Sequence, residues 1–334
     1  MNYFLYLVIG LNSAIQEELR CSLLSLKKVS VKKDFEVVIC TDVDLTIEWA
    51  SFDFKITVNI LSRNQVSEWL SGTNYLLILK PRMIQDFLEH HQGNVLFLDT
   101  DTFFMRDPAD LFDAVGKGKL VMHLKENTIT KRKSFRENVL PHTFRLTNGE
   151  EFRISRSTGM WNSGVIGISN RHAGLLEEVL FLIDQMWKIG RWHTVEQFAL
   201  SYFFQREGKI IPADRYVMHY WFFPRTRYLL HSYFDVSDET GKKFIGEMME
   251  RGVLDKTLVY ERLPRYSLEI LAACSTIFDW YLYNLPGNTH PGKILRKVMV
   301  RDLRSLAFVL RAAYKMKFHQ DIIREFYTPK FEYI

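Results

Sequence analysis

The sequence contains little cysteine: its 334 residues include only Cys21, Cys40 and Cys274. No two of them form a Cys-x-x-Cys pair. Their odd number and wide spacing argue against a disulfide framework and against a zinc site. We therefore expect a reducing environment and predict a cytoplasmic location for the chain.

Long hydrophobic runs are also absent. No segment approaches the roughly 18 uninterrupted apolar residues that a membrane-spanning helix requires. The apolar run at residues 3–9 has no basic residue before it and is too short for a signal peptide. We predict that it forms a buried first strand.

The composition is that of an ordinary globular protein, with 47% hydrophobic and 25% charged residues and a net charge of +5. The positive charge is uneven: residues 131–156 hold seven Lys or Arg against three Glu, and residues 291–334 hold ten against four acidic residues. Such surfaces suit anionic partners such as a nucleotide diphosphate, an acidic acceptor or anionic lipid headgroups, and we expect no nucleic acid.

Strand and helix patterns alternate along the first two thirds of the chain. Short continuous apolar runs are typical of buried strands, and apolar residues at helical spacing follow several of them. This alternation predicts an α/β fold with a doubly wound sheet. We expect a catalytic domain over residues 1–238, with a long polar loop or insertion at 127–157, and a mainly helical, basic region over residues 239–334.

Polar residues stand where three of the predicted strands end. In doubly wound sheets, ligands bind at the carboxyl ends of the strands, so three such ends predict one shared site. The candidate binding residues at these ends are Gly10, Leu11, Asn12, Asp42 and Thr100.

Asp99 and Asp101 flank Thr100 directly after the apolar run 95–98. In an extended chain, residues two apart point to the same side, so the two carboxylates can share Mn²⁺ or Mg²⁺. Such an ion neutralises a departing diphosphate. Two alternatives remain open. In one, Asp99 caps a turn and Asp101 is solvated. The other is a phosphatase of the haloacid dehalogenase type, whose motif normally has Thr or Val at the position of Phe103.

His219 ends a short apolar segment and precedes two aromatic residues. Neutral imidazole is a suitable third ligand for Mn²⁺, which predicts the metal ligands Asp99, Asp101 and His219. The alternative is a histidine that only packs in the core.

Three further groups are candidates for binding or catalysis. Asn162, Ser163 and Gly164 combine close backbone approach with an amide and a hydroxyl that can bind sugar, although a tight turn explains them equally well. Glu196 and Gln197 place a carboxylate and an amide at the start of a predicted helix, where such pairs are common without a function. Either Lys80 or Arg82 could bind phosphate, or both could be solvated helix charges.

In their order and approximate spacing over residues 3–221, these groups resemble the GT-A glycosyltransferases. They are most similar to family 8, which includes glycogenin and the bacterial lipopolysaccharide galactosyltransferases. The resemblance implies a GT-A fold with a doubly wound mixed sheet, a nucleotide-diphosphate sugar as donor, and retention of the anomeric configuration. It also assigns roles: Asp99, Asp101 and His219 as metal ligands, Lys80 or Arg82 as the basic donor-binding residue, Asn162 in the donor-sugar pocket, and Gln197 beneath the anomeric carbon.

The chain departs from the family pattern at two points. Glu196 stands where the family has Asp, which is a mild chemical change. The family's terminal motif, whose Lys binds the diphosphate, is absent after His219. Arg225 or Arg227 would have to replace that Lys.

The sequence therefore predicts a metal-dependent hexosyltransferase that moves a sugar, most simply from a UDP-sugar, to an acceptor hydroxyl, with Glu196 and Gln197 as catalytic residues. The alternatives are a catalytically silent sugar-binding or scaffold protein on the same fold, and a sugar nucleotidyltransferase, which usually has a Gly-rich signature near its first strand. Basic and apolar residues interleave over residues 291–334. This region either binds the inner membrane surface, which suits a lipid-linked glycan acceptor, or packs on the domain.

Overall fold

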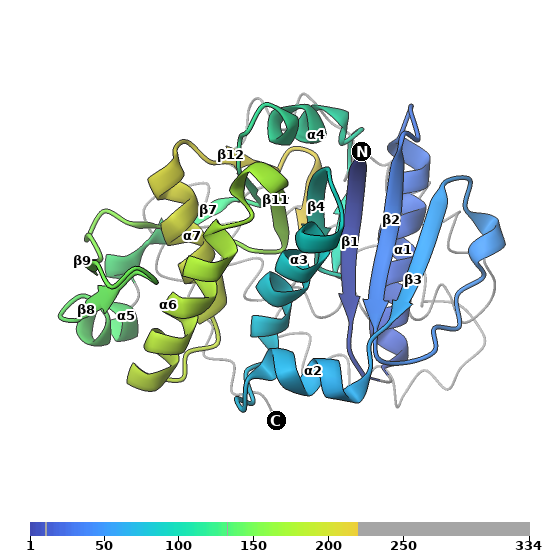
Figure 1. Cartoon of the computed structure of the whole chain (residues 1–334). Helices are drawn as coiled ribbons and strands as arrows, with labels where there is room; N and C mark the ends of the chain where they lie inside the picture. The colour runs from blue at the N-terminus through green and yellow to red at the C-terminus, as the bar shows by residue number, and fades with distance from the viewer. Residues whose placement is uncertain (11, 132, 220–334) are drawn as a thin grey trace, which may run out of the picture. The chain divides into compact units, whose positions relative to one another are not determined.

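The computed structural model describes residues 1–10, 12–131 and 133–219, and the structural statements below concern only these residues (Figure 1). Leu11, the predicted boundary at residue 238 and the predicted helical region at 239–334 lie outside the described residues. Arg225 and Arg227 lie outside them as well.

A mixed seven-stranded sheet forms the centre of the described part, in the order β12-β6-β11-β4-β1-β2-β3. The strands β1 to β4 run parallel, whereas β11 runs antiparallel to both β4 and β6. This arrangement confirms the α/β fold class expected from the sequence. The strands are β1 (Asn2–Val8), β2 (Phe35–Thr41), β3 (Lys55–Ile60), β4 (Asn94–Leu98), β6 (Val121–Met122), β11 (Val165–Ser169) and β12 (Ile211–Pro212).

Helices cover both faces of this sheet. Side chains of α1 and α4 pack in one core, and those of α3, α6 and α7 pack in the other. The helices are α1 (Ser13–Val29), α2 (Arg63–Leu70), α3 (Leu79–His90), α4 (Ala109–Gly116), α5 (Lys133–Asn138), α6 (Leu175–Ile189) and α7 (Val195–Glu207). Four 3-10 turns lie at Trp49–Ser51, Leu76–Ile78, Ile129–Lys131 and Asn170–His172.

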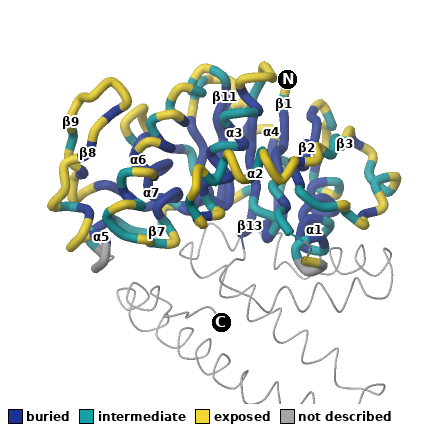
Figure 2. The backbone as a smooth tube through the Cα atoms, turned by 60° about the horizontal axis from the view of Figure 1, so that its bottom comes forward, coloured by how far each residue is buried: buried dark blue, intermediate teal, exposed yellow. Residues whose placement is uncertain are grey.

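Strand β1 separates the two cores because successive side chains of a strand point to opposite faces. Tyr3 and Leu5 pack with α3 and α6, whereas Phe4, Tyr6 and Val8 pack with α1 and α4. Figure 2 shows the resulting concentration of buried residues in the central strands. A continuous apolar run therefore serves two cores, and the prediction that it forms a buried first strand is confirmed.

Three two-stranded sheets surround the central one: β5 (Thr102–Phe104) with β13 (Val217–His219), β7 (Lys125–Thr128) with β10 (Gly159–Trp161), and β8 (Thr143–Arg145) with β9 (Glu151–Arg153). The prediction of a long loop at 127–157 was wrong, since β7, α5 and the β8–β9 pair occupy it. Its isolated apolar residues show no periodicity in the sequence, yet Phe135 and Phe144 are buried in the core that contains α6 and α7.

The register of the central sheet brings distant segments to one edge. Because β1 lies between β2 and β4 and is parallel to both, the carboxyl ends of these three strands are neighbours. Strand β11 begins at the same edge, where Val165 is opposite Leu98. Asp99 follows Leu98 directly, and Gly164 directly precedes Val165.

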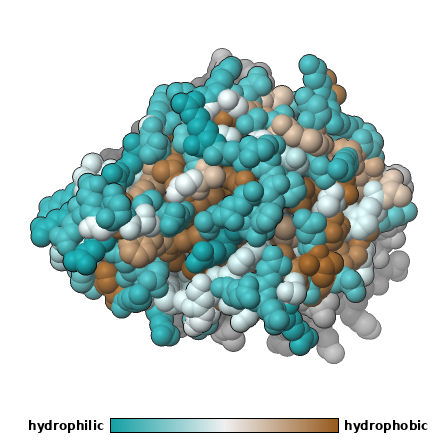
Figure 3. Space-filling view, in the orientation of Figure 1, coloured by the Kyte–Doolittle hydropathy of each residue, from teal (hydrophilic) through white to brown (hydrophobic). Residues whose placement is uncertain are grey.

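The surface of the described part is mixed. On the face drawn in Figure 3, hydrophilic residues separate areas of hydrophobic ones. The large apolar side chains of Val31, Ile60 and Leu76 are exposed. Over the described residues, every helix is too short or too polar to span a bilayer.

Candidate functional site

Two short strands bring the predicted metal ligands together. Asp99 and Asp101 lie in the connection between β4 and β5. Strand β13 pairs antiparallel with β5, with His219 opposite Thr102. This pairing places His219 beside Asp101, although 118 residues separate the two in the sequence.

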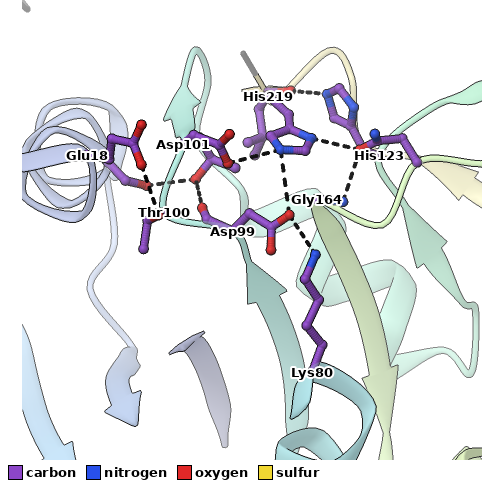
Figure 4. Close-up of polar contacts among 12 residues, drawn as sticks. Glu18, Lys80, Asp99, Thr100, Asp101, His123, Gly164 and His219 are labelled. Carbon is purple, nitrogen blue, oxygen red and sulfur yellow. Dashed lines mark hydrogen bonds and ion pairs between the residues drawn. The ribbon is translucent and has the colours of Figure 1, made fainter. Parts of the chain in front are cut away.

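The three side chains converge from these elements (Figure 4). His219 Nε2 lies 3.0 Å from Asp101 Oδ1 and 3.6 Å from Asp99 Oδ2. One ligand atom from each residue lies within 4.8 Å of the others. Asp101 and His219 are buried, and Asp99 is partly exposed.

This donor set fits a divalent cation. Ions bound at about 2.1 Å hold adjacent octahedral ligands about 3 Å apart, close to the two Nε2–carboxylate distances seen here. Two carboxylates with one imidazole suit Mn²⁺, which accepts both oxygen and nitrogen ligands. Burial lowers the pKa of His219, but the neighbouring Asp101 and Asp99 carboxylates outweigh this effect and leave it raised.

Lys80, rather than Arg82, reaches the aspartate pair. Lys80 is buried on α3, and its Nζ donates to Asp99 Oδ2 at 2.7 Å. Burial lowers the pKa of Lys80, but the Asp99 and Glu196 carboxylates raise it more, so the ammonium stays charged. Arg82 Nε is buried without a hydrogen-bond partner among the described residues, and burial lowers its pKa.

Asn162 and Gly164 support the other side of the His219 ring. Asn162 Oδ1 accepts a hydrogen bond from His219 Nδ1 at 2.8 Å and another from the Gly164 amide at 3.0 Å. A Cβ atom on Gly164 would lie 2.0 Å from His219 Nδ1, so only glycine leaves room for the ring. The Gly164 carbonyl also accepts from the Asp99 amide.

A second histidine packs against this ring. His123 meets His219 edge to face, with ring centroids 5.5 Å apart, and its Nε2 donates to the Val217 carbonyl. Burial, followed by the neighbouring His219, lowers the pKa of His123 to about 3. His123 is therefore a neutral packing partner at ordinary pH.

Glu196 and Gln197 lie in the first turn of α7, and both are buried. The Glu196 amide donates to Tyr75 Oη, which in turn donates to the His193 carbonyl. Burial raises the pKa of Glu196 to about 7, and Lys80 opposes this shift. Ser163 is buried and also lowers that pKa through its hydroxyl.

Helix α1 supports the Asp99–Asp101 segment from behind with polar side chains. Ser22 Oγ lies 2.9 Å from both Tyr6 Oη and Thr102 Oγ1, and Thr102 Oγ1 donates to the Asp99 carbonyl. Thr100 Oγ1 donates to Glu18 Oε2 at 3.3 Å. Thr100 thus contacts α1 through its side chain.

The loops after β1 and β2 meet, as expected from the strand ends. The Gly10 amide donates to Asp42 Oδ1 at 2.7 Å, and Gly10 has a φ of 83°, which glycine adopts without strain. Asn12 is exposed. These contacts bring Gly10 and Asp42 together at one edge of the sheet.

Sequence patterns missed several residues of this site. Glu126 in β7 accepts hydrogen bonds from both Asn162 and Gln197. No motif points to it, because it stands in the short polar strand Lys125–Thr128 without apolar alternation. Glu18 and His123 were missed as well, and each becomes apparent only through packing.

Comparison with known proteins defines the class of the chain. Residues 38–246 match the model of the nucleotide-diphospho-sugar transferase family. The chain belongs to this family. The match covers more than half of the transferase and includes every predicted site residue except those near Gly10. No curated protein sequence gives a significant match.

Three solved structures illustrate what this chain is similar to. Mouse xyloside xylosyltransferase 1 in its apo form is 14% identical and has a TM-score of 0.44, with 64% of this chain and 85% of the other covered. The galactosyltransferase LgtC with donor and acceptor sugar analogues is 12% identical (TM-score 0.40; 61% and 70% covered). Apo GlyE of Streptococcus pneumoniae TIGR4 is 16% identical (TM-score 0.36; 64% and 45% covered).

Proposed function

We propose that this transferase moves a sugar from a nucleotide-diphosphate donor, with a UDP-sugar as the first candidate, to an acceptor hydroxyl with the help of Mn²⁺ or Mg²⁺. The observation that carries the proposal is the convergence of Asp99, Asp101 and His219 in a chain of the nucleotide-diphospho-sugar transferase family. These three residues would hold the ion. When bound, it would neutralise the diphosphate as the sugar leaves.

The chain's own groups complete the charge balance. Lys80 is a buried, charged ammonium beside Asp99, which suits the negative charge of a donor diphosphate. Gly10 and Asp42 are proposed to contact the nucleoside, together with Leu11 and Asn12. Asn162, Ser163 and Gly164 are proposed to contact the donor sugar, where the polar side chains can bind hydroxyl groups.

The transfer itself needs an acceptor held against the anomeric carbon. The acceptor oxygen forms a bond to this carbon as the bond to the diphosphate oxygen breaks, and the departing diphosphate takes up the acceptor's proton. We assign Glu196 and Gln197 the task of orienting the acceptor or stabilising the positive charge that develops on the sugar. A retaining outcome of the family 8 type is part of the proposal.

The acceptor is proposed to be a carbohydrate or a lipid-linked glycan, as in lipopolysaccharide synthesis. A cytoplasmic chain could meet such a lipid through residues 291–334, whose basic and apolar residues suit an anionic surface. Flotation of the full chain with anionic and with neutral vesicles tests this part. Equal recovery with both vesicle types, or unchanged recovery without residues 291–334, would count against it.

The metal assignment is tested with Asp101→Asn. Donor hydrolysis and transfer are measured over a panel of nucleotide sugars, with and without Mn²⁺, and thermal shift records binding. We expect the variant to lose metal-dependent turnover by more than about 100-fold. Loss of a residue that only supports a metal ligand costs up to about 100-fold, and loss of a ligand itself should cost more. Asp113→Asn, on the exposed face of α4, should behave as wild type. Full transfer by Asp101→Asn in saturating Mn²⁺ would refute the metal set.

A catalytically silent sugar-binding protein on the same fold gives a different pattern. It would show stabilisation by a nucleotide sugar without hydrolysis or transfer. A scaffold protein on the same fold would show no metal-dependent stabilisation by any nucleotide. A nucleotidyltransferase would instead consume a nucleoside triphosphate with a sugar phosphate.

A further inference from the structure

A carboxylate outside the predicted site lies between two of its amides. Glu126, in β7, accepts from Asn162 Nδ2 through Oε1 and from Gln197 Nε2 through Oε2, both at 3.1 Å. Asn162 and Gln197 are buried, at 4% and 7% exposure, and Glu126 is partly buried. A single carboxylate thus orients amides from two separate segments of the chain.

The orientation of the Asn162 amide is fixed from both ends. An ionised carboxylate only accepts hydrogen bonds, so the atom of Asn162 that faces Glu126 must be the amide nitrogen. The Gly164 backbone N–H only donates, so the atom that faces it must be the carbonyl oxygen. A flipped amide would lose both contacts.

This orientation determines which ring nitrogen of His219 carries the hydrogen that points to Asn162. Asn162 Oδ1 can only accept, so His219 Nδ1 must donate to it. The lone pair of a neutral ring then lies on Nε2, the atom that faces Asp101 and Asp99. Partners of this kind set the tautomer and the direction of metal-binding histidines.

We propose that Glu126 is a positioning residue that acts through Asn162 to direct His219 Nε2 toward the ion site, and that it orients the Gln197 amide at the same time. The inference rests on the proposed function in so far as Mn²⁺ is the ion. Glu126 couples the metal site to the segment that begins α7.

Two substitutions separate orientation from charge. Glu126→Ala removes both acceptors, so the NH₂ groups of Asn162 and Gln197 lose the partner that holds them. Glu126→Gln keeps one carbonyl oxygen, which Asn162 should take because Gly164 already fixes its orientation. Among the described residues, the Gln197 side chain has no second hydrogen bond of this kind, so its amide can turn to accept from the new Gln side chain.

The experiment measures Mn²⁺ affinity of the full chain by electron paramagnetic resonance of the free ion. We expect Glu126→Ala to weaken binding about tenfold, the usual effect of losing an outer partner of a ligand. Glu126→Gln should stay near the wild-type affinity while donor turnover falls. Glu36→Ala is the matched control, because Glu36 also binds two side chains, Lys55 and Thr57, at the other end of the sheet.

Equal affinities of Glu126→Ala and Glu36→Ala would overturn the proposal, and so would equal weakening by Glu126→Ala and Glu126→Gln. Nuclear magnetic resonance of the metal-free protein provides a second measurement. The hydrogens of the Asn162 side-chain NH₂ should exchange with solvent slowly in wild type and rapidly in Glu126→Ala. An unchanged exchange rate would count against the proposal that Glu126 orients Asn162. If wild type bound no Mn²⁺ while Glu126→Ala still sped the exchange of the Asn162 NH₂ hydrogens, the proposed function would fail. The role of Glu126 in orienting Asn162 would then still stand.

Discussion

At the scale of single residues, Gly164 has the tightest surroundings in the site. Its amide binds Asn162, its carbonyl accepts from Asp99, and its α-carbon faces the His219 ring. A side chain there would meet the ring at 2.0 Å, below any normal contact. Close packing of this kind keeps His219 pointed toward Asp101.

Gly164→Ala should therefore displace His219 and weaken Mn²⁺ binding by at least about tenfold. Isothermal titration of Mn²⁺ into the full chain measures the effect. Gly174→Ala is the control, because a Cβ on Gly174 meets nothing within 4 Å. If both variants bound Mn²⁺ equally well, His219 would not be a ligand.

Glu196 should make the stability of the protein depend on pH. Its pKa rises from 4.5 to about 7 in the folded state because of burial. Between these values the unfolded chain is ionised and the folded chain stays protonated, so stability falls as pH rises, by roughly 3 kcal/mol in all. The loss is complete above the folded pKa.

Glu196→Gln removes this titration. Urea unfolding in EDTA at pH 5 and pH 8 should show that the variant loses less stability than wild type between these two conditions. Only the difference between the pH values is compared, so any constant effect of the amide cancels. Parallel stability curves for the two proteins would contradict the raised pKa.

Residue identities in the site were only partly predictable. The sequence indicated Asp99, Asp101 and His219 because they follow apolar strands, and the structure brings them together. It left Lys80 and Arg82 as alternatives, because residues two apart on a helix point about 200° apart and the sequence does not show which face is inward. Contact with Asp99 identifies Lys80.

At the scale of elements, α1 supports the Asp99–Asp101 segment through a chain of hydroxyls. Tyr6, Ser22 and Thr102 are buried and joined by hydrogen bonds that end on the Asp99 carbonyl. Ser25 extends the contact, since its Oγ accepts from the Phe104 amide. The helix thus holds β5 at both ends of its three residues.

Ser22→Ala should cost about 1–3 kcal/mol of unfolding free energy, because it leaves buried hydroxyls on Tyr6 and Thr102 without their shared partner. Chemical unfolding followed by circular dichroism measures this loss. Ser51→Ala is the control, because it removes a hydroxyl whose hydrogen bond to the Glu48 carbonyl is exposed to solvent. It should change the free energy of unfolding by less than about 0.5 kcal/mol. Similar small changes in both variants would show that water replaces the Ser22 contacts.

Element prediction succeeded where apolar runs are continuous and failed over residues 127–157, where several short elements lack a pattern. Strands β1 and β4 are continuous apolar runs, and each was expected near its observed position, as was the start of helix α7. Strands such as β5 have only three residues, too few for any pattern. They are defined by their partners, as β5 is by β13.

At the scale of the whole molecule, metal binding should be linked to folding, because the ligands come together only in the native sheet. Mn²⁺ at 100 times its dissociation constant should add about 2.7 kcal/mol to the free energy of unfolding. Urea titrations with Mn²⁺ and with EDTA measure the gain.

Asp101→Asn provides the control for this linkage. It should unfold at the same urea concentration with and without Mn²⁺, since the ion loses a buried ligand. A gain of equal size in wild type and variant would place the ion elsewhere in the protein.

The distance between the ligands along the chain has a consequence for biosynthesis. Asp101 leaves the ribosome long before His219, which follows 118 residues later. Strand β13 can pair with β5 only after residues 217–219 have also left the ribosome. A nascent chain that ends before His219 carries Asp99, Asp101 and Lys80 but lacks the third proposed ligand. Binding of an ion by the complete proposed ligand set is therefore a late event in synthesis. A ribosome-bound fragment that stops before residue 219 would lack this complete set.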